Sequence, residues 1–259
     1  MLIFFQYRIR GKRIEKVAFH KQFGAWEFRI AGTSYLSSGP GWVYDYDYLI
    51  DQFRKLSGFH YMPENGDTVV DVGAGVGEET IILSQRVGPT GKVFAIEAHP
   101  RTFQALSYLK EVNRLNNTFL SDKALSDQPG TIQIEDSDNS LANSIIHSGS
   151  IRTYSVSAET FDQFVERNNI ASIDFLKMNV EGAEQLIIKG MINSLPKIKR
   201  LAISCHDFRF HQGESEFFKT KEIVSRFFQD HGFRVKIRNT SVPMVDDYLF
   251  AINPALEQK

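Results

Sequence analysis

The sequence predicts an α/β protein with a Rossmann-like sheet of mainly parallel strands and helices on both faces. A β-rich segment and an aromatic helix precede that sheet as an appendage. From residue 68 onward, apolar runs of strand length alternate with segments of helix length, which is typical of a parallel sheet with crossover helices. A glycine-rich turn follows the first of these runs at Gly73. Before residue 63 the alternation is absent, and the pattern is that of hairpin strands.

The composition of the 259-residue chain is typical of a globular protein with one large domain and an appendage. A hydrophobic content of 42% and a charged content of 24% argue against a disordered chain or a coiled coil. The net charge of -1 gives no general attraction to nucleic acid. A single cysteine excludes an internal disulfide, and no apolar run reaches the roughly 18 residues of a membrane span. We therefore expect a cytoplasmic protein without a membrane or nucleic-acid partner.

Residues 1–62 are predicted to form the appendage. The first thirty residues contain seven Lys or Arg and two Asp or Glu, so this segment is locally basic. The simplest interpretation is a solvated edge strand followed by a packed aromatic helix. Alternatively, the appendage covers the substrate side of the site or forms a contact in a homodimer. We expect strands over 3–9, 14–19 and 25–30, a loop over 32–41 and an aromatic helix over 42–53.

Residues 63–259 are predicted to form the main domain. Ligands of such sheets bind beyond the carboxyl ends of the strands, at the point where the strand order reverses. Functional residues should therefore directly follow strands. We expect strands over 68–72, 92–97, 118–121, 173–178, 198–204, 233–237 and 248–252, helices over 78–86, 101–115, 158–168, 183–190 and 216–231, and a Gly/Ser/Asn-rich segment over 126–155.

The glycine-rich turn is the strongest local motif. Gly73, Gly75 and Gly77 form G-x-G-x-G, whereas the dinucleotide fingerprint requires G-x-G-x-x-G. A pyrophosphate at the start of the following helix would also meet the carboxylates of Glu78 and Glu79. These acids repel a phosphate and favour a cationic ligand. The glycine spacing disfavours a dehydrogenase. The alternative is a tight turn that binds no ligand.

An acidic residue stands where a ribose would be recognised. Glu97 ends the second strand of the alternation, twenty residues beyond Gly77, and can accept hydrogen bonds from both ribose hydroxyls. Asp71 lies in register with it on the preceding strand. A positively charged nucleoside without phosphates corresponds to S-adenosylmethionine better than to NAD. The sequence thus predicts S-adenosylmethionine as the cofactor.

Five blocks occur in a fixed order along the chain: VVDVGAGVGEET, AIEAHPRTFQAL, ALSDQPG, ETFDQF and IDFLKMNVEGAEQLIIKGM. Together they resemble the FkbM family of class I S-adenosylmethionine-dependent methyltransferases. The resemblance covers roughly residues 60 to 205, and the V-E-G-A-E core is its most specific part. It implies a class I methyltransferase fold. It also implies methylation of a hydroxyl of a specialised metabolite or sugar, with an amide or peptide nitrogen as the alternative.

The resemblance also implies residue roles. The glycine loop would hold the amino-acid part of the cofactor, Glu97 the ribose, and Asp122 or Lys123 the adenine. Asn179 stands where the family usually carries Asp; its amide keeps an acceptor and gains donors but cannot act as a base. The residues expected to bind the cofactor are Asp71, Gly73, Ala74, Gly75, Gly77, Glu97, Ala98, Asp122, Lys123 and Asn179.

Catalysis is predicted at the edge that follows the strand over 198–204. His206 could take a proton near neutral pH, and Asp207 could orient it or bind the substrate. Asn179 completes the set of expected catalytic residues. The alternative is structural: His206 caps the strand end, and Asp207 begins a turn.

We expect no bound metal, because Asn179 lacks the carboxylate that an oxygen-rich magnesium site favours. The expected partner is a small-molecule or peptide substrate. A nucleic-acid methyltransferase would need a concentrated basic face and an N/D-P-P-Y-type motif, whereas Val180-Glu181-Gly182 follows Asn179. A cofactor-binding protein without catalysis is the remaining alternative.

Overall fold

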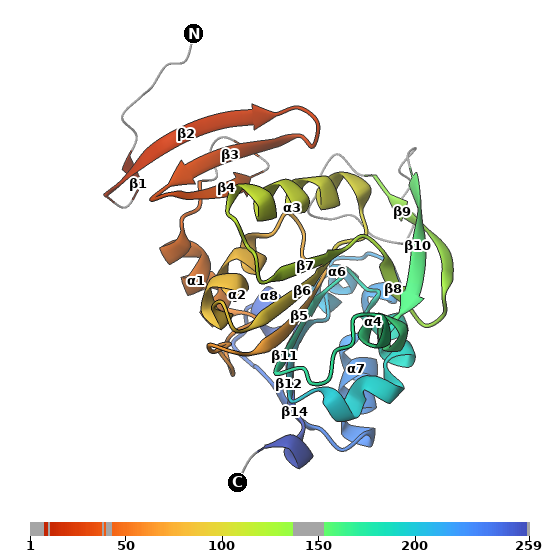
Figure 1. The fold of residues 1–259 in the computed structure, drawn as a ribbon. Helices are drawn as coiled ribbons and strands as arrows, with labels where there is room; N and C mark the ends of the chain where they lie inside the picture. The colour runs from red at the N-terminus through yellow and green to blue at the C-terminus, as the bar shows by residue number, and fades with distance from the viewer. Residues whose placement is uncertain (1–7, 10, 38, 40–42, 137–152, 258–259) are drawn as a thin grey trace.

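The structure is a computed structural model that describes residues 8–9, 11–37, 39, 43–136 and 153–257. The strands of its main sheet are β5 (Thr68–Val72), β6 (Lys92–Ile96), β7 (Thr118–Ser121), β11 (Phe175–Asn179), β12 (Arg200–Ser204), β13 (Arg234–Ile237) and β14 (Tyr248–Ile252). They lie in the order β13-β14-β12-β11-β5-β6-β7 (Figure 1). β14 runs antiparallel to both of its neighbours, β12 and β13, and the other neighbouring pairs are parallel. This confirms the predicted Rossmann-like sheet.

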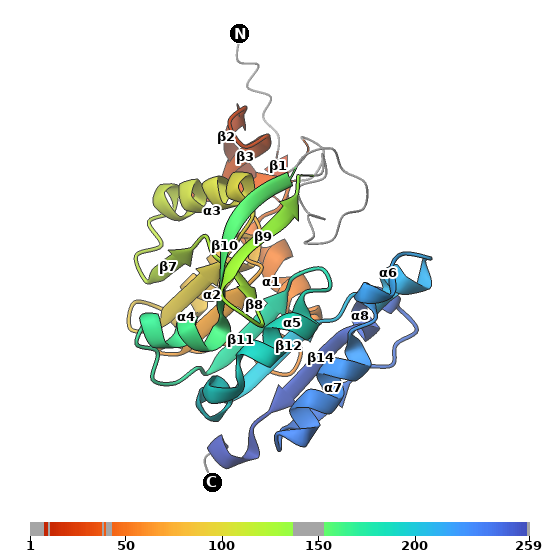
Figure 2. The same ribbon diagram turned by 90° about the vertical axis from the view of Figure 1, so that its right-hand side faces the viewer.

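Helices cover both faces of this sheet (Figure 2). Strand residues alternate between the faces, so Val69 packs on one side while Val70 and Val72 pack on the other. The Val69 face carries α1 (Tyr46–Lys55), α2 (Glu78–Val87) and α3 (Pro100–Val112), and the Val70 face carries α4 (Phe161–Arg167), α5 (Glu184–Ile187) and α7 (Lys221–Asp230). Two short helices, α6 (Asp207–His211) and α8 (Pro243–Asp246), follow β12 and β13 along the chain.

The strand order reverses at β5, the first strand of the main sheet. The chain passes from β5 to β6 and β7 on one side, and later returns to β11 and β12 on the other. The carboxyl ends of β5 and β11 therefore form the topological switch point, where open α/β sheets bind their ligands. Gly73 follows β5 there, and Asn179 ends β11.

The appendage is a four-stranded antiparallel sheet followed by α1. Its strands are β1 (Arg8–Ile9), β2 (Lys12–His20), β3 (Ala25–Ile30) and β4 (Thr33–Ser37), paired in that order. Phe28 and Leu36 share a hydrophobic core with Val69 and Ile81 of the main domain. The carboxylate of Glu27, fully buried, also accepts a 2.8 Å hydrogen bond from the Tyr108 hydroxyl on α3. The appendage is thus packed onto the domain by both apolar and polar contacts.

The largest differences between the structure and the expected elements lie in two places. Part of the expected loop over 32–41 is strand β4, because the turn at Ala31 and Gly32, both with positive φ, returns the chain beside β3. The glycine-rich segment contains a second small sheet of β8 (Ala124–Ser126), β9 (Gly130–Glu135) and β10 (Thr153–Thr160). Residues 137–152 of that segment, Ile3 to Tyr7 of the first expected strand, Ser38, Pro40 and Gly41 of the expected loop, and Trp42 of the expected aromatic helix lie outside the described residues. No helix among the described residues is long and apolar enough to cross a membrane.

Candidate active site

The glycine loop lies at the switch point and is fastened to both neighbouring strands. The backbone N–H groups of Gly73 and Ala74 donate to the carbonyl of Ile96, at 2.9 and 3.0 Å. A Cβ added at Gly73 would stand 1.9 Å from the carbonyl oxygen of Asn179. Only glycine fits at this position. Its lack of a side chain lets the backbone after β5 approach the backbone at the end of β11 closely.

Glu97 is held in a fixed orientation next to this loop. One carboxylate oxygen accepts from the N–H of Gly75 and the other from the N–H of His99, both at 2.9 Å. Burial raises the pKa of Glu97, although these two N–H groups act in the opposite direction. Each carboxylate oxygen has a further lone pair, so the group can still accept hydrogen bonds from ligand hydroxyls.

A buried cation supports the loop from below. The Lys177 ammonium lies 2.9 Å from the Asp71 carboxylate and 3.3 Å from that of Glu79, and it donates to the carbonyl of Gly73 at 2.9 Å. Burial acts to lower the pKa of Lys177, but the two carboxylates outweigh it and the pKa is raised. Asp71 also accepts a 2.8 Å hydrogen bond from Thr80. The amino-terminal end of α2 and the loop are thereby tied to β11.

A cavity of about 520 Å³ opens over the loop. This volume is in the range of small-molecule sites. Six residues predicted to bind the cofactor line it: Gly73, Ala74, Gly75, Glu97, Ala98 and Asn179. The region expected to read adenine is apolar instead, because Ala124, Leu125, Ile132 and Ile134 line the cavity there.

The other predicted cofactor residues do not line the cavity. Asp71 lies behind the loop with Lys177. Gly77 is the N-cap of α2, and its lack of a side chain leaves room for Leu106 and Leu109 of α3. Asp122 is exposed, and Lys123 forms a 3.5 Å ion pair with Glu159. The observed contacts of these residues support the fold around the site. That they contact the cofactor stays a prediction.

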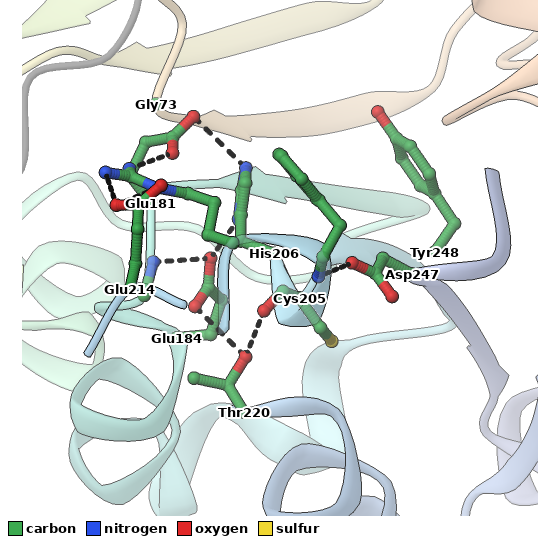
Figure 3. A network of polar contacts seen from close by, with 12 residues as sticks. Gly73, Glu181, Glu184, Cys205, His206, Glu214, Thr220, Asp247 and Tyr248 are labelled. Atoms are coloured by element: carbon green, nitrogen blue, oxygen red, sulfur yellow. Dashed lines mark hydrogen bonds and ion pairs between the residues drawn. The ribbon is translucent and has the colours of Figure 1, made fainter. Parts of the chain in front are cut away.

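His206 is enclosed in a polar network behind the cavity (Figure 3). Its ring nitrogens lie 3.2 Å from Glu181 and 3.1 Å from Glu184, and the residue has a left-handed backbone. Burial acts to lower the pKa of His206, but the two carboxylates raise it to about 10. A ring that is already protonated has no free lone pair for a proton, so this arrangement favours the structural alternative over a general base.

Asp207 has a structural contact of its own. Its carboxylate accepts from the N–H groups of Thr220 and Lys221, at 2.8 and 2.9 Å, and so caps the start of α7. Neither Asp207 nor His206 lines the cavity, whereas Glu181 does. Glu181 lies between His206 and Arg209, whose guanidinium is 2.6 Å away. The polar network thus presents Glu181 to the cavity.

Part of the cavity wall comes from residues that were not among the predicted site residues. Tyr44 and Tyr48 stack at 5.2 Å between ring centroids and line the cavity, although core packing was the simpler interpretation of these aromatics. Glu78 also lines it; burial and the neighbouring Glu79 raise its pKa to about 7. Tyr248 enters from β14, and burial raises its pKa to about 12. The spacing of Tyr44 and Tyr48, four residues apart, was the available signal.

The cavity fits the predicted cofactor on three observations. The side-chain oxygen of Asn179 is buried and accepts no hydrogen bond from the described residues, so it can receive a donor from a ligand. The space above Gly75 is open, because a Cβ added there would meet no atom within 4 Å. Glu97 offers acceptors for hydroxyls. Among the described residues, no group of three or more His, Cys, Asp or Glu could hold a metal ion.

The chain was compared with known proteins. The family model described as the methyltransferase FkbM domain matches residues 71–235. The hexuronic acid methyltransferase AglP of Haloferax volcanii is 28% identical over 146 residues, which are 55% of this chain and 57% of that protein. The chain thus matches little more than half the length of this relative.

The chain is also similar to the solved structures of a methyltransferase and of a protein that binds S-adenosylmethionine. The FkbM methyltransferase of Methylobacillus flagellatus has 16% identity and a TM-score of 0.49, over 75% of this chain and 45% of that chain. Fibrillarin of Aeropyrum pernix with bound S-adenosylmethionine has 16% identity and a TM-score of 0.47, over 93% of this chain and 99% of that chain.

Proposed function

Because the chain belongs to the FkbM methyltransferase family, a family of S-adenosylmethionine-dependent enzymes, we propose that it methylates a hydroxyl group of a small carbohydrate or a specialised metabolite. The observation that carries this proposal is the cavity at the switch point. There a fixed carboxylate, Glu97, and an amide oxygen without a partner among the described residues, that of Asn179, face one open space beside the glycine loop. The relative that acts on a hexuronic acid supports a sugar as the acceptor class.

The protein's own residues divide the work of binding. Glu97 would accept the ribose hydroxyls, and the apolar wall that includes Leu125 and Ile134 would take the adenine. Asn179 would accept a donor from the amino-acid part of the cofactor. The cofactor supplies a methyl group on a positively charged sulfur, which is an activated leaving group. Alignment of the acceptor oxygen with that methyl group is then the main requirement.

The acceptor must also lose a proton. As the new carbon–oxygen bond forms and the carbon–sulfur bond breaks, the hydroxyl proton must pass to a base. Glu78 lines the cavity, and its pKa of about 7, raised by burial and by Glu79, suits a general base near neutral pH. We therefore place the proton on the Glu78 carboxylate, in place of His206.

Calorimetry with S-adenosylmethionine tests the cofactor assignment. The wild-type protein should bind the cofactor, and Glu97→Gln should weaken binding at least about tenfold, because one carboxylate acceptor becomes a donor. Glu111→Gln, on the exposed side of α3, is the control and should bind like the wild type. Equal affinity of all three proteins would remove Glu97 from the site and leave the proposed function without its main support.

A further inference from the structure

The ionisable side chains that line the cavity are mainly acidic. Glu78, Glu79, Glu97 and Glu181 face it, and the cationic side chain among its described lining residues is Lys177. Such a lining attracts the positively charged cofactor. It also limits the charge of any second molecule that enters beside the cofactor.

Lys177 cannot serve an anionic ligand without losing its own partners. Its ammonium has three N–H groups, and it already contacts the carboxylates of Asp71 and Glu79 and the carbonyl of Gly73. The side chain is 4% exposed. An acceptor carboxylate would therefore have to displace a buried carboxylate to reach it, which is costly.

The other candidate donors for an anion are engaged or neutral. Burial lowers the pKa of His99, despite the nearby Asp136 carboxylate, so its ring is uncharged at neutral pH. The loop N–H groups of Gly73 and Ala74 donate to Ile96, and that of Gly75 donates to Glu97. These positions offer no charge to a carboxylate.

Two further cations lie behind the cavity wall and are neutralised there. The Arg209 guanidinium lies 2.6 Å from the carboxylates of both Glu181 and Glu214. His206 lies between Glu181 and Glu184 (Figure 3). Neither cation lines the cavity. The carboxylate of Glu181 stands between them and the cavity, so a ligand there meets a negative charge first.

The remaining polar wall consists of neutral groups. Tyr44, Tyr48 and Gln52 line one side of the cavity, and Tyr248 lines it from β14. Hydroxyl and amide groups donate and accept hydrogen bonds without charge, and they pair well with hydroxyls. The stacked faces of Tyr44 and Tyr48 add apolar surface of the kind that receives the C–H face of a sugar ring.

We propose that the methyl acceptor of this chain is an uncharged polyhydroxy compound, a neutral sugar or its glycoside, and that the cavity rejects acceptors that carry a carboxylate. This inference rests on the proposed function. It separates the chain from its relative, whose acceptor, a hexuronic acid, is an anion at neutral pH. The physical reason is that a carboxylate on the acceptor would face the carboxylates of Glu78, Glu97 and Glu181. Lys177, the cation among the described lining residues, is already paired with Asp71 and Glu79.

A competition experiment tests the proposal. The full chain is incubated with S-adenosylmethionine labelled in its methyl group and an equimolar pool of neutral hexose glycosides and the matching hexuronic acid glycosides. Labelled products are then separated by anion exchange. We expect the neutral fraction to carry at least about ten times the label of the acidic fraction, because the acidic lining repels an acceptor of like charge.

Two variants of one cavity residue control for charge. Gln52→Arg places a cation in the wall and should move label toward the hexuronic acid glycosides, whereas Gln52→Met, of similar length without charge, should not. If calorimetry shows that S-adenosylmethionine binds but no neutral glycoside in the pool becomes labelled, the proposal of a neutral acceptor is wrong. Absence of cofactor binding would instead contradict the proposed function, so the two failures are distinguishable.

Discussion

The ammonium of Lys177 lies 2.9 Å from Oδ1 of Asp71, in the interior below the glycine loop. Both side chains are almost fully buried. The same ammonium donates to the carbonyl of Gly73, so one ion pair fixes the loop, the end of β5 and the end of β11. The stability of the site and the shape of its cavity therefore depend on the same contact.

Removal of the Lys177 charge should destabilise the protein strongly. Lys177→Met leaves Asp71 without its cation in the interior, and we expect the free energy of unfolding to fall by about 3–5 kcal/mol. Urea denaturation measures this. Lys199→Met is the matched control, because Lys199 pairs with Asp174 near the surface and should cost at most about 1 kcal/mol. Similar losses in both variants would contradict a special role for the buried pair.

Alanine substitutions should separate the two glycines of the loop. Gly73→Ala forces a Cβ to 1.9 Å from the carbonyl of Asn179, and the protein should lose more stability than the roughly 1–2 kcal/mol of a left-handed backbone. The Cβ of Gly75→Ala would contact no atom, so this variant should lose only the free energy of placing alanine in a left-handed backbone. Its methyl group would occupy the cavity, however, and should weaken cofactor binding.

Urea denaturation measures the loss of stability, and calorimetry with S-adenosylmethionine measures the loss of cofactor affinity. Gly213→Ala is the control: it has a positive φ and open space like Gly75, and its residue does not line the cavity. It should lose similar stability and keep its cofactor affinity. Equal affinities of Gly75→Ala and Gly213→Ala would show that the cofactor does not lie over Gly75.

Two neighbouring acids should respond to amide substitution in opposite directions. Burial and Glu79 raise the pKa of Glu78 from 4.5 to about 7. Its contribution to stability is therefore present below pH 4.5 and lost as the pH rises to about 7, so the charged form destabilises the protein at pH 8. Glu78→Gln should then stabilise the protein without cofactor at pH 8 by about 1–3 kcal/mol.

Glu79→Gln should destabilise the protein, because Glu79 pairs with Lys177 and accepts a hydrogen bond from the Ser57 hydroxyl. Urea denaturation at pH 5 and pH 8 compares both variants. If Glu78 is the base, the rate of methyl transfer in the wild type should also rise through about pH 7, and Glu78→Gln should lose this limb. A stability gain for Glu79→Gln, or a loss for Glu78→Gln at pH 8, would contradict the burial argument.

The contribution of His206 to stability should depend on pH. Burial alone would lower its pKa, but Glu181 and Glu184 raise it from 6.5 to about 10. The stabilisation is therefore fully present below pH 6.5 and is lost as the pH rises through about 10. His206→Gln should cost several kcal/mol at pH 6 and much less at pH 10.

Denaturation at these two pH values measures the difference, with the exposed His211→Gln as the control. Because His206 does not line the cavity, cofactor affinity should change little. A cost that does not vary with pH would show that the ring is not held as a cation between the two acids.

Local patterns in the sequence were sufficient for the sheet and for part of the site. Alternating strand and helix signals, and the G-x-G-x-G turn followed by Glu97, depend on neighbouring residues and on fixed spacing, which are visible in the chain. The appendage was less predictable. The segment of β4 was expected to be a loop. Thr33 to Ser37 form a strand only through their pairing with β3, which the local sequence does not reveal.

The sequence by itself determined the fold, the family and the position of the glycine loop with its acidic partner, because each follows from periodicity and short-range motifs. Only the tertiary structure decided the protonation state and place of the polar side chains. His206 lies between two carboxylates from another segment, while Glu78 lies at the cavity beside the like charge of Glu79. The charge of a buried group depends on its neighbours in space, and these come from residues far apart in the chain.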